Sequence, residues 1–259
     1  MISLVPEPFT SRLLKGGALL DETRRVVELW DLALGPSTNL DRISSENLLG
    51  KASRARLDEV LAVIKPRLVG GGDHIVPALK GLLGDHRAFV EACYFEASRA
   101  DTLLAAFAEV PLWTLWHQGR IGIGLAETED WLRSLLADRG TAEWSDSVRV
   151  RVARGLLSTL RDFGILAGAV RGRRKEIVAP SMSPLGFAYV AWREHERGAS
   201  SRALVRSTVW HRWLLDQERV IDLFGQAARL GVLRFSSAGS AVRIDWLVRT
   251  LAEVTGAAA

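Results

Sequence analysis

The densest group of side chains able to bind a charged ligand is a short run of cations in the second half of the chain. The run consists of Arg171, Arg173, Arg174 and Lys175, and the segment before it adds Arg151 and Arg154. Duplex DNA presents closely spaced phosphates, and each cation that neutralises one releases counterions, so such a cluster favours salt-sensitive DNA binding. Arginine also forms bidentate contacts with phosphates or guanine edges. An exposed turn can carry arginine without any binding role, so both interpretations stay open at this point.

A second group of cations, Lys51, Arg54 and Arg56, lies at the start of a predicted helix over residues 53–68. Helix N-termini bind phosphate through free backbone N–H groups and the helix dipole. The shorter helix predicted over 39–49 and the brief turn between the two resemble a helix-turn-helix. The alternative, which we favour for this group, is a solvated face opposite an apolar stripe that contains Leu57 and Leu61.

Recognisable signatures of catalysis are absent from the sequence. It contains no P-loop, no His-Glu-x-x-His motif, no Cys-x-x-Cys pair and no Gly-x-Ser-x-Gly motif. The Gly-x-Gly fragments between Gly119 and Gly124 lack the strand–helix context of a dinucleotide fingerprint. The five histidines are scattered without the spacing of metal ligands. We therefore predict a protein that is not an enzyme and that uses no cofactor or metal.

The nine tryptophans are numerous for a chain of 259 residues. Exposed aromatic rings can stack on single-stranded bases, but tryptophans beside apolar helical residues more often fill a core. Trp210 and Trp213, which flank His211 and Arg212, are the pair whose exposure would point to stacking. The single cysteine, Cys93, lies between Ala92 and Tyr94, and this setting predicts a buried helical position.

Helical periodicity dominates the first half of the chain. Helices are predicted over residues 21–34, 39–49, 53–68, 77–99, 101–109 and 127–139. The triplet Gly70-Gly71-Gly72 reads as a linker because glycine imposes little conformational restraint. We predict an N-terminal helical domain over residues 1–140, with a possible break at 70–72.

A helix followed by a basic β-hairpin is predicted after residue 140. In the helix over 146–162, Val152, Leu156 and Leu160 fall on one side, whereas Arg151 and Arg154 fall on the other. Gly164 is suited to the left-handed conformation that ends helices. Short extended runs over 165–170 and 176–179 then flank the Arg171–Lys175 tip, as in a hairpin.

The same arrangement recurs 67 positions later, when Gly231 is aligned with Gly164. The second unit has a predicted helix over 218–230, strands over 232–236 and 242–244, and a turn at Ala238-Gly239. Helices over 184–197 and 200–215 separate the two units. We therefore predict a mainly α fold in which an N-terminal helical bundle precedes a domain over 141–259 with two winged-helix-like units.

The bulk composition is that of a globular protein, with 48% hydrophobic and 25% charged residues and a formal net charge of +4. No stretch approaches the ~20 apolar residues that a membrane-spanning helix needs. The N-terminus lacks the basic start and apolar run of a signal peptide, and one cysteine fits a reducing compartment. We expect a cytoplasmic protein without membrane contact.

Several segments resemble the BrxA family. The opening Lys15-Gly16-Gly17-Ala18-Leu19-Leu20, followed by Glu22 and the stretch 24–30, is similar to the start of that family. Glu46-Asn47-Leu48-Leu49 leading into 53–68 and the helix end at 160–166 are similar too. The resemblance covers roughly residues 9–246 and is least secure from Pro184 onward.

The resemblance implies a small component of the BREX bacteriophage-defence system. Members of the family are helical, have been compared with the RNA-binding factor NusB, and bind double-stranded DNA. They act beside a DNA methyltransferase, a large ATPase and a phosphatase-like protein. The resemblance supplies no catalytic residues, and it defines no motif for DNA contact. The site residues predicted above therefore rest on charge alone.

We expect a non-enzymatic, double-stranded DNA-binding protein whose contacts are mainly to phosphates, with weak sequence preference. Two alternatives stay open. The first is a protein–protein adaptor whose hairpins dock other BREX components, and the second is an RNA-binding module of the NusB type. The sequence does not indicate an oligomeric state.

Overall fold

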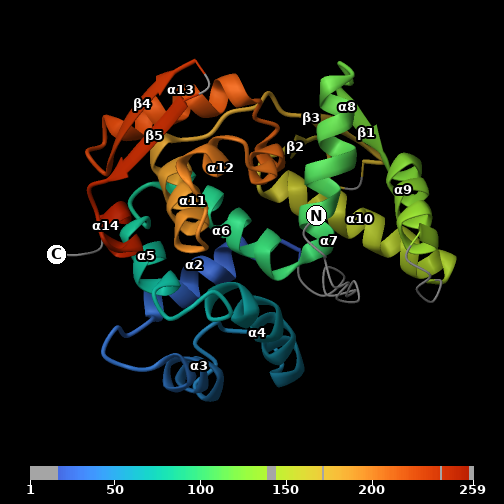
Figure 1. Ribbon diagram of the computed structural model, residues 1–259. Coiled ribbons are helices and arrows are strands. Elements are labelled where there is room, and N and C mark those ends of the chain that lie inside the picture. The colour runs from blue at the N-terminus through green and yellow to red at the C-terminus, as the bar shows by residue number, and fades with distance from the viewer. Residues whose placement is uncertain (1–16, 139–143, 171, 240, 257–259) are drawn as a thin grey trace.

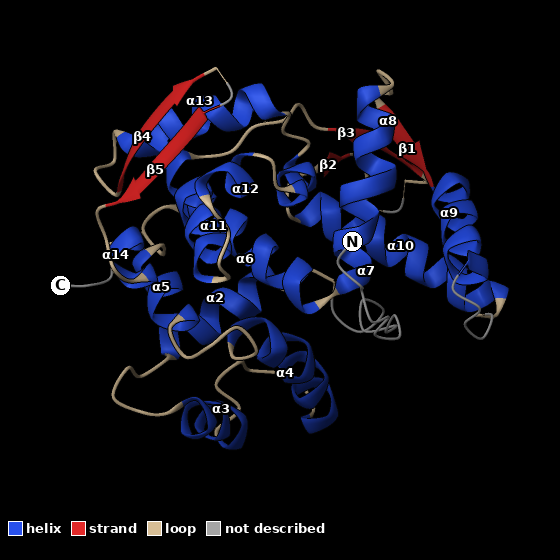
Figure 2. Ribbon diagram, in the orientation of Figure 1, coloured by secondary structure: helices blue, strands red, loops and turns tan. Residues whose placement is uncertain are grey.

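The computed structural model describes residues 17–138, 144–170, 172–239 and 241–256, and most of these residues are helical. Small antiparallel sheets of two or three strands complete the fold (Figure 2). The mainly α prediction is therefore confirmed. No helix within the described ranges is long and apolar enough to cross a membrane.

The first half of the chain forms short and medium helices that pack around α6. In order they are α2 (Leu20–Leu29), α3 (Pro36–Ser45), α4 (Arg54–Leu68), α5 (Ile75–Gly81), α6 (His86–Ala100), α7 (Thr102–Phe107), the π-helix η1 (Ala108–Leu112) and α8 (Trp113–His117). The single helix predicted over 77–99 is interrupted before His86. Asp85 accepts a hydrogen bond from the backbone N–H of Ala88 at 3.0 Å, so it caps α6 and fixes where that helix begins.

The second half contains the two predicted helix-plus-hairpin units. Its elements are β1 (Gly122–Gly124), α9 (Leu125–Asp138), α10 (Asp146–Asp162), β2 (Leu166–Ala167), β3 (Arg174–Ile177), α11 (Pro184–Glu196), α12 (Ser201–Val205), the 3-10 helix η2 (Thr208–Trp213), α13 (Gln217–Ala228), β4 (Leu233–Ala238), β5 (Ala241–Trp246) and α14 (Leu251–Thr255). The helix predicted over 200–215 is divided into α12 and η2, and Leu214, whose backbone is left-handed with φ of 57°, ends η2.

Two glycines end the helices that precede the hairpins. Gly164 follows α10 and Gly231 follows α13, and both have φ of 78°. Residues other than glycine rarely adopt this left-handed backbone conformation. It turns the chain out of the helix and into a strand. Gly164 and Gly231 therefore have the same backbone conformation at equivalent positions of the two units, as the sequence predicts.

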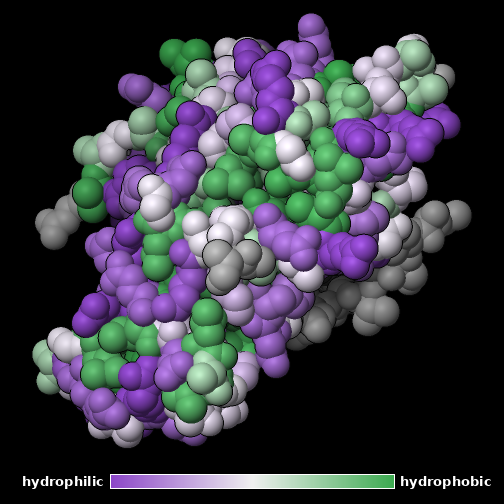
Figure 3. Space-filling view, turned by 90° about the vertical axis from the view of Figure 1, so that its left-hand side faces the viewer, coloured by the Kyte–Doolittle hydropathy of each residue, from purple (hydrophilic) through white to green (hydrophobic). Residues whose placement is uncertain are grey.

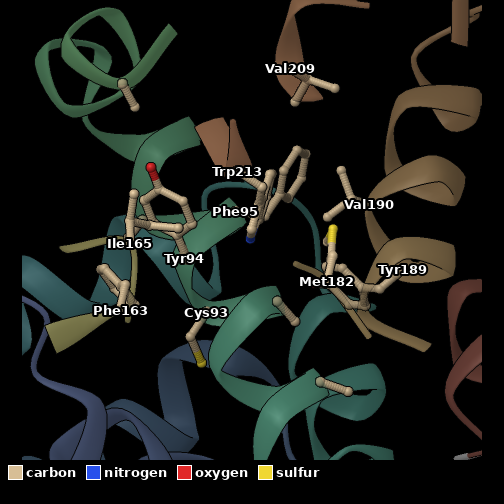
Figure 4. Close-up of a cluster of buried hydrophobic side chains, with 14 of the residues drawn as sticks. Cys93, Tyr94, Phe95, Phe163, Ile165, Met182, Tyr189, Val190, Val209 and Trp213 are labelled. Carbon is tan, nitrogen blue, oxygen red and sulfur yellow. The ribbon is translucent and has the colours of Figure 1, made fainter. Parts of the chain in front are cut away.

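A shared core lies between α6, α11, the end of α10 and η2 (Figure 4). The ring of Tyr94 on α6 lies 5.1 Å from that of Phe163 and 5.0 Å from that of Trp213, centroid to centroid. Burial raises the pKa of Cys93 on the same helix. Its thiol is therefore held protonated, as expected for a packing residue.

The predicted linker at Gly70-Gly71-Gly72 is instead a packed turn. A Cβ on Gly71 would lie 2.7 Å from Nη2 of Arg193 on α11 and 3.1 Å from the guanidinium carbon of Arg99 on α6. Arg193 also donates to the Gly71 carbonyl at 3.3 Å. Glycine is needed here because the guanidinium groups of Arg99 and Arg193 approach the backbone closely.

The expected domain boundary at residue 140 falls inside one structural unit. β1, from before the boundary, pairs with β3, from after it, and α9 packs on α10. Figure 1 shows α8, β1, α9 and α10 grouped at one end of the molecule, with β4 and β5 at the opposite end. The two expected domains therefore share a sheet.

Candidate nucleic-acid interface

The outward face of α10 carries Arg151 and Arg154. The opposite face buries Val152, Leu156 and Leu160 in the core, so helical periodicity directs the two arginines to solvent. Arg151 donates from Nε to the backbone carbonyl of Ser147 at 3.2 Å. Both guanidinium groups remain exposed, as the sequence predicts.

The hairpin after α10 belongs to a three-stranded sheet with the strand order β1-β3-β2. The backbone N–H of Leu125, at the start of α9, donates to the carbonyl of Arg173 at 2.8 Å. Arg174 donates from its guanidinium to the carbonyl of Gly122 on β1 at 3.3 Å. These bonds hold the hairpin backbone while the side chains of Arg173 and Arg174 stay exposed.

Lys175 does not share this exposure. Side chains alternate along a strand, so Lys175 lies on the opposite face of β3 from Arg174. It is 2% exposed, and its ammonium donates to the carbonyl of Ala169 inside the hairpin. Burial, together with the nearby charge of Arg161, lowers the pKa of Lys175. The sequence predicts that Lys175 contacts phosphate. We correct that expectation, because the ammonium group already donates a hydrogen bond within the hairpin.

Replacing Lys175 by methionine tests this correction. Methionine keeps an unbranched chain of similar length and removes a buried charge, so we expect duplex affinity to stay within about twofold of wild type. Fluorescence anisotropy on a labelled duplex measures the effect. A tenfold loss of affinity, with the thermal midpoint unchanged, would return Lys175 to the interface.

The arginines of this region differ in whether they form ion pairs. Arg149 pairs with Asp146, Arg161 with Asp162, and Arg120 with Glu127. No described carboxylate forms an ion pair with any of the four arginines that the sequence singled out. Those four are Arg151, Arg154, Arg173 and Arg174. Their charge is thus available to an external anion. Arg171, the remaining predicted residue of the tip, lies outside the described residues.

The second predicted group has a different electrostatic setting. Lys51 pairs with Glu22 at 2.8 Å and lowers the pKa of that carboxyl, against a burial effect that by itself raises it. Arg54 pairs with Asp58 at 3.1 Å, and Arg56 pairs with Glu59 at 3.2 Å.

The start of α4 is also occupied. Ser53 accepts from the backbone N–H of Arg56 at 3.2 Å, so one donor that a bound phosphate would use already has a partner. With a carboxylate beside each of its cations, this group presents much less net positive charge than the α10 and hairpin face.

The tryptophans considered for base stacking are buried. Trp210 is 1% exposed and Trp213 is 3% exposed, and the indole N–H of Trp210 donates to the carbonyl of Leu204 at 2.6 Å. Neither ring presents a face to solvent. Within the described ranges, no group of three or more His, Cys, Asp or Glu side chains could hold a metal ion.

One element of the site, β1, was not predicted. Its three residues, Gly122–Gly124, are too few to show the two-residue period of a strand. The available signal is the alternation Ile121, Ile123, Leu125 around these glycines. A Cβ on Gly122 would lie 2.6 Å from the carbonyl oxygen of Lys175, so glycine is what allows the two strands to pair closely.

Comparison with known proteins identifies the family. The sequence model of the BrxA family matches residues 7–193. The chain belongs to the BrxA family. This membership supports a role associated with the BREX system. All the site residues predicted from the sequence lie within the part that matches BrxA.

The fold is also similar to a solved structure described as the crystal structure of an uncharacterized protein from Magnetospirillum magneticum. The TM-score is 0.60 at 16% sequence identity, and the alignment covers 80% of this chain and 98% of the other. At this identity the likeness concerns the fold alone. No curated protein matches the sequence.

Proposed function

We propose that this BrxA-family protein binds double-stranded DNA through the α10 and hairpin unit, by contacts directed mainly at phosphates. The observation that carries the proposal is the set of four exposed arginines without carboxylate partners, Arg151 and Arg154 on the helix and Arg173 and Arg174 on the hairpin. Such cations are free to replace the counterions of a duplex.

The connectivity of the unit supports the proposal. β1, α9, α10, β2 and β3 follow one another, and β3 lies between β1 and β2. A winged helix has this order of elements, with a recognition helix before the hairpin. In helix-turn-helix proteins the recognition helix lies in the major groove while a neighbouring element contacts the backbone. In this proposal α10 takes the place of the recognition helix, and the hairpin is the wing.

The residue types in the site favour contact with the backbone over reading of sequence. Asparagine and glutamine, which pair with adenine, are absent from α10, and the exposed side chains there are arginine, serine and aspartate. Arginine contacts to phosphate position a protein without selecting bases. We therefore propose weak sequence preference, within a BREX assembly that also contains the methyltransferase, ATPase and phosphatase-like components.

Lys51, Arg54 and Arg56 are retained as a secondary contact. On binding, their carboxylate partners must either be displaced or remain beside the DNA. In both cases the contribution of each cation to the binding free energy is smaller. In this proposal the secondary group adds little to affinity at physiological salt.

The test is fluorescence anisotropy of the full chain on a labelled random-sequence duplex, from about 50 to about 200 mM salt. The proposal predicts an affinity that falls linearly on a log–log plot, with a slope at least as steep as about −4, the value for four phosphate contacts. A structured RNA that competes better than duplex DNA would favour the RNA-binding alternative. Absence of binding at the lowest salt would contradict the proposal and favour an adaptor.

A further inference from the structure

The C-terminal part of the chain carries a net positive charge. Residues 197–259 contain nine arginines and no lysine, against five aspartate and glutamate residues, which gives +4. Because the formal net charge of the whole chain is also +4, residues 1–196 are neutral overall. This segment lies entirely beyond Arg193, where the match to the BrxA family ends.

Most of these arginines are exposed and have no carboxylate partner among the described residues. Arg202, Arg206, Arg219, Arg229, Arg234 and Arg249 belong to this set. Arg243 is exposed too but pairs with Asp245 at 2.8 Å. Upstream, the exposed Arg25 and Arg133 have a carboxylate beside them, whereas the four exposed arginines of the α10 unit do not.

The elements that carry this charge repeat the arrangement of the α10 unit. α13 ends at a left-handed glycine, Gly231, and leads into the antiparallel β4–β5 hairpin. Phe235 on β4 stacks on Phe224 of α13 with ring centroids 5.4 Å apart, which fixes the hairpin against the helix. The helix and hairpin form one packed body, and exposed arginines project from both.

The hairpin has one face packed and the other exposed. Leu233 and Ile244 are buried toward α13, whereas Arg234 and Ser236 are exposed, and Arg243 lies opposite Ser236. Toward the tip the exposed residues Ser237 and Ala238 are small and uncharged. Figure 3 views the side of the molecule that carries this hairpin, where hydrophilic and hydrophobic residues are interspersed.

We propose that the C-terminal unit, α13 with the β4–β5 hairpin, is a second contact surface for duplex DNA. One chain would then hold DNA at two helix-plus-hairpin units. The inference rests on the proposed function of the α10 unit and adds a site outside the part that matches BrxA. Duplex DNA is the favoured occupant because every cation is arginine, whose planar fork suits bidentate phosphate contacts.

The experiment compares three double variants of the full chain on one duplex of about 30 base pairs, roughly three helical turns. Arg229→Glu/Arg234→Glu alters the C-terminal unit, and Arg173→Glu/Arg174→Glu alters the first unit. Arg25→Glu/Lys65→Glu is the matched control, because it makes the same charge change at exposed positions on α2 and α4. Circular dichroism and the thermal midpoint verify that each variant is folded.

The inference predicts that Arg229→Glu/Arg234→Glu lowers affinity at least about tenfold at 50 mM salt and reduces the log–log slope by about 1.8, which is 0.9 for each lost phosphate contact. The control should change affinity by less than about threefold, through net charge alone. Equal affinities for the C-terminal variant and the control, with the first-unit variant still weakened, would overturn this inference and leave the proposed function intact. Wild type that binds no duplex would overturn both.

Discussion

Reversing the charge of Arg173 and Arg174 is expected to reduce duplex affinity more than any other pair of substitutions in the α10 unit. Both side chains are exposed on the hairpin and have no ion-pair partner among the described residues. Each glutamate removes one phosphate contact and adds a negative charge beside the backbone. We expect affinity to fall at least about tenfold at 50 mM salt and the log–log slope to decrease by about 1.8.

Two features ensure that a loss of affinity in this variant reports on the hairpin. The backbone of Arg173 is held by Leu125 and that of the hairpin by pairing with β1, so the substitutions should leave the fold intact. The control Arg25→Glu/Lys65→Glu applies the same change in net charge elsewhere. Unchanged affinity in Arg173→Glu/Arg174→Glu would move the DNA site away from this hairpin.

The largest expected loss of stability follows from Glu96→Gln. Glu96 lies on α6 and is 1% exposed. Its carboxylate accepts from the Tyr189 hydroxyl and the Arg193 Nε, both at 3.0 Å, and from the Arg99 Nε at 2.6 Å. One buried carboxylate thus accepts hydrogen bonds from three donors on α6 and α11.

The electrostatics of the network explain the size of the effect. Burial alone would lower the pKa of Arg193, but the Glu96 carboxylate opposes this and raises it. Glutamine has one acceptor oxygen and no charge, so Arg99 would lose its carboxylate partner and the buried Arg193 would keep only Glu196, at 2.8 Å. We expect a loss of about 3 to 5 kcal/mol in the free energy of unfolding, the usual range for breaking a buried ion pair.

Chemical denaturation measures this loss. The matched control is Asp130→Asn, because Asp130 pairs with Arg133 at 2.6 Å on the exposed face of α9. A surface pair contributes less than about 1 kcal/mol. If Glu96→Gln costs no more than Asp130→Asn, the network between α6 and α11 is not a main source of stability.

The sequence predicts the helix and hairpins of the site well because their signals are local. α10 spans Asp146–Asp162, the range that amphipathic periodicity indicates, and Gly164 and Gly231 end their helices as expected. The exposed positions of Arg151 and Arg154 follow from the same period. Each of these features depends on residues within one or two helical turns.

The corrections concern features that depend on distant residues. Gly71 looks like a linker in sequence, but its neighbours in space are Arg99 and Arg193. Lys175 looks like part of a basic tip, but the alternation of β3 turns its side chain inward. β1 becomes a strand only because β3 pairs with it, in a register that places Ile123 opposite Lys175, 52 residues downstream. Local patterns carry no information on such contacts.

The location of the DNA site is tested most directly by photo-crosslinking. A duplex with photoreactive groups along its backbone is bound to the full chain at low salt and irradiated, and the modified peptides are identified by mass spectrometry. We expect adducts on α10 and on the hairpin peptide that contains Arg173 and Arg174. Adducts confined to α2 and α4, with none between residues 144 and 178, would contradict it.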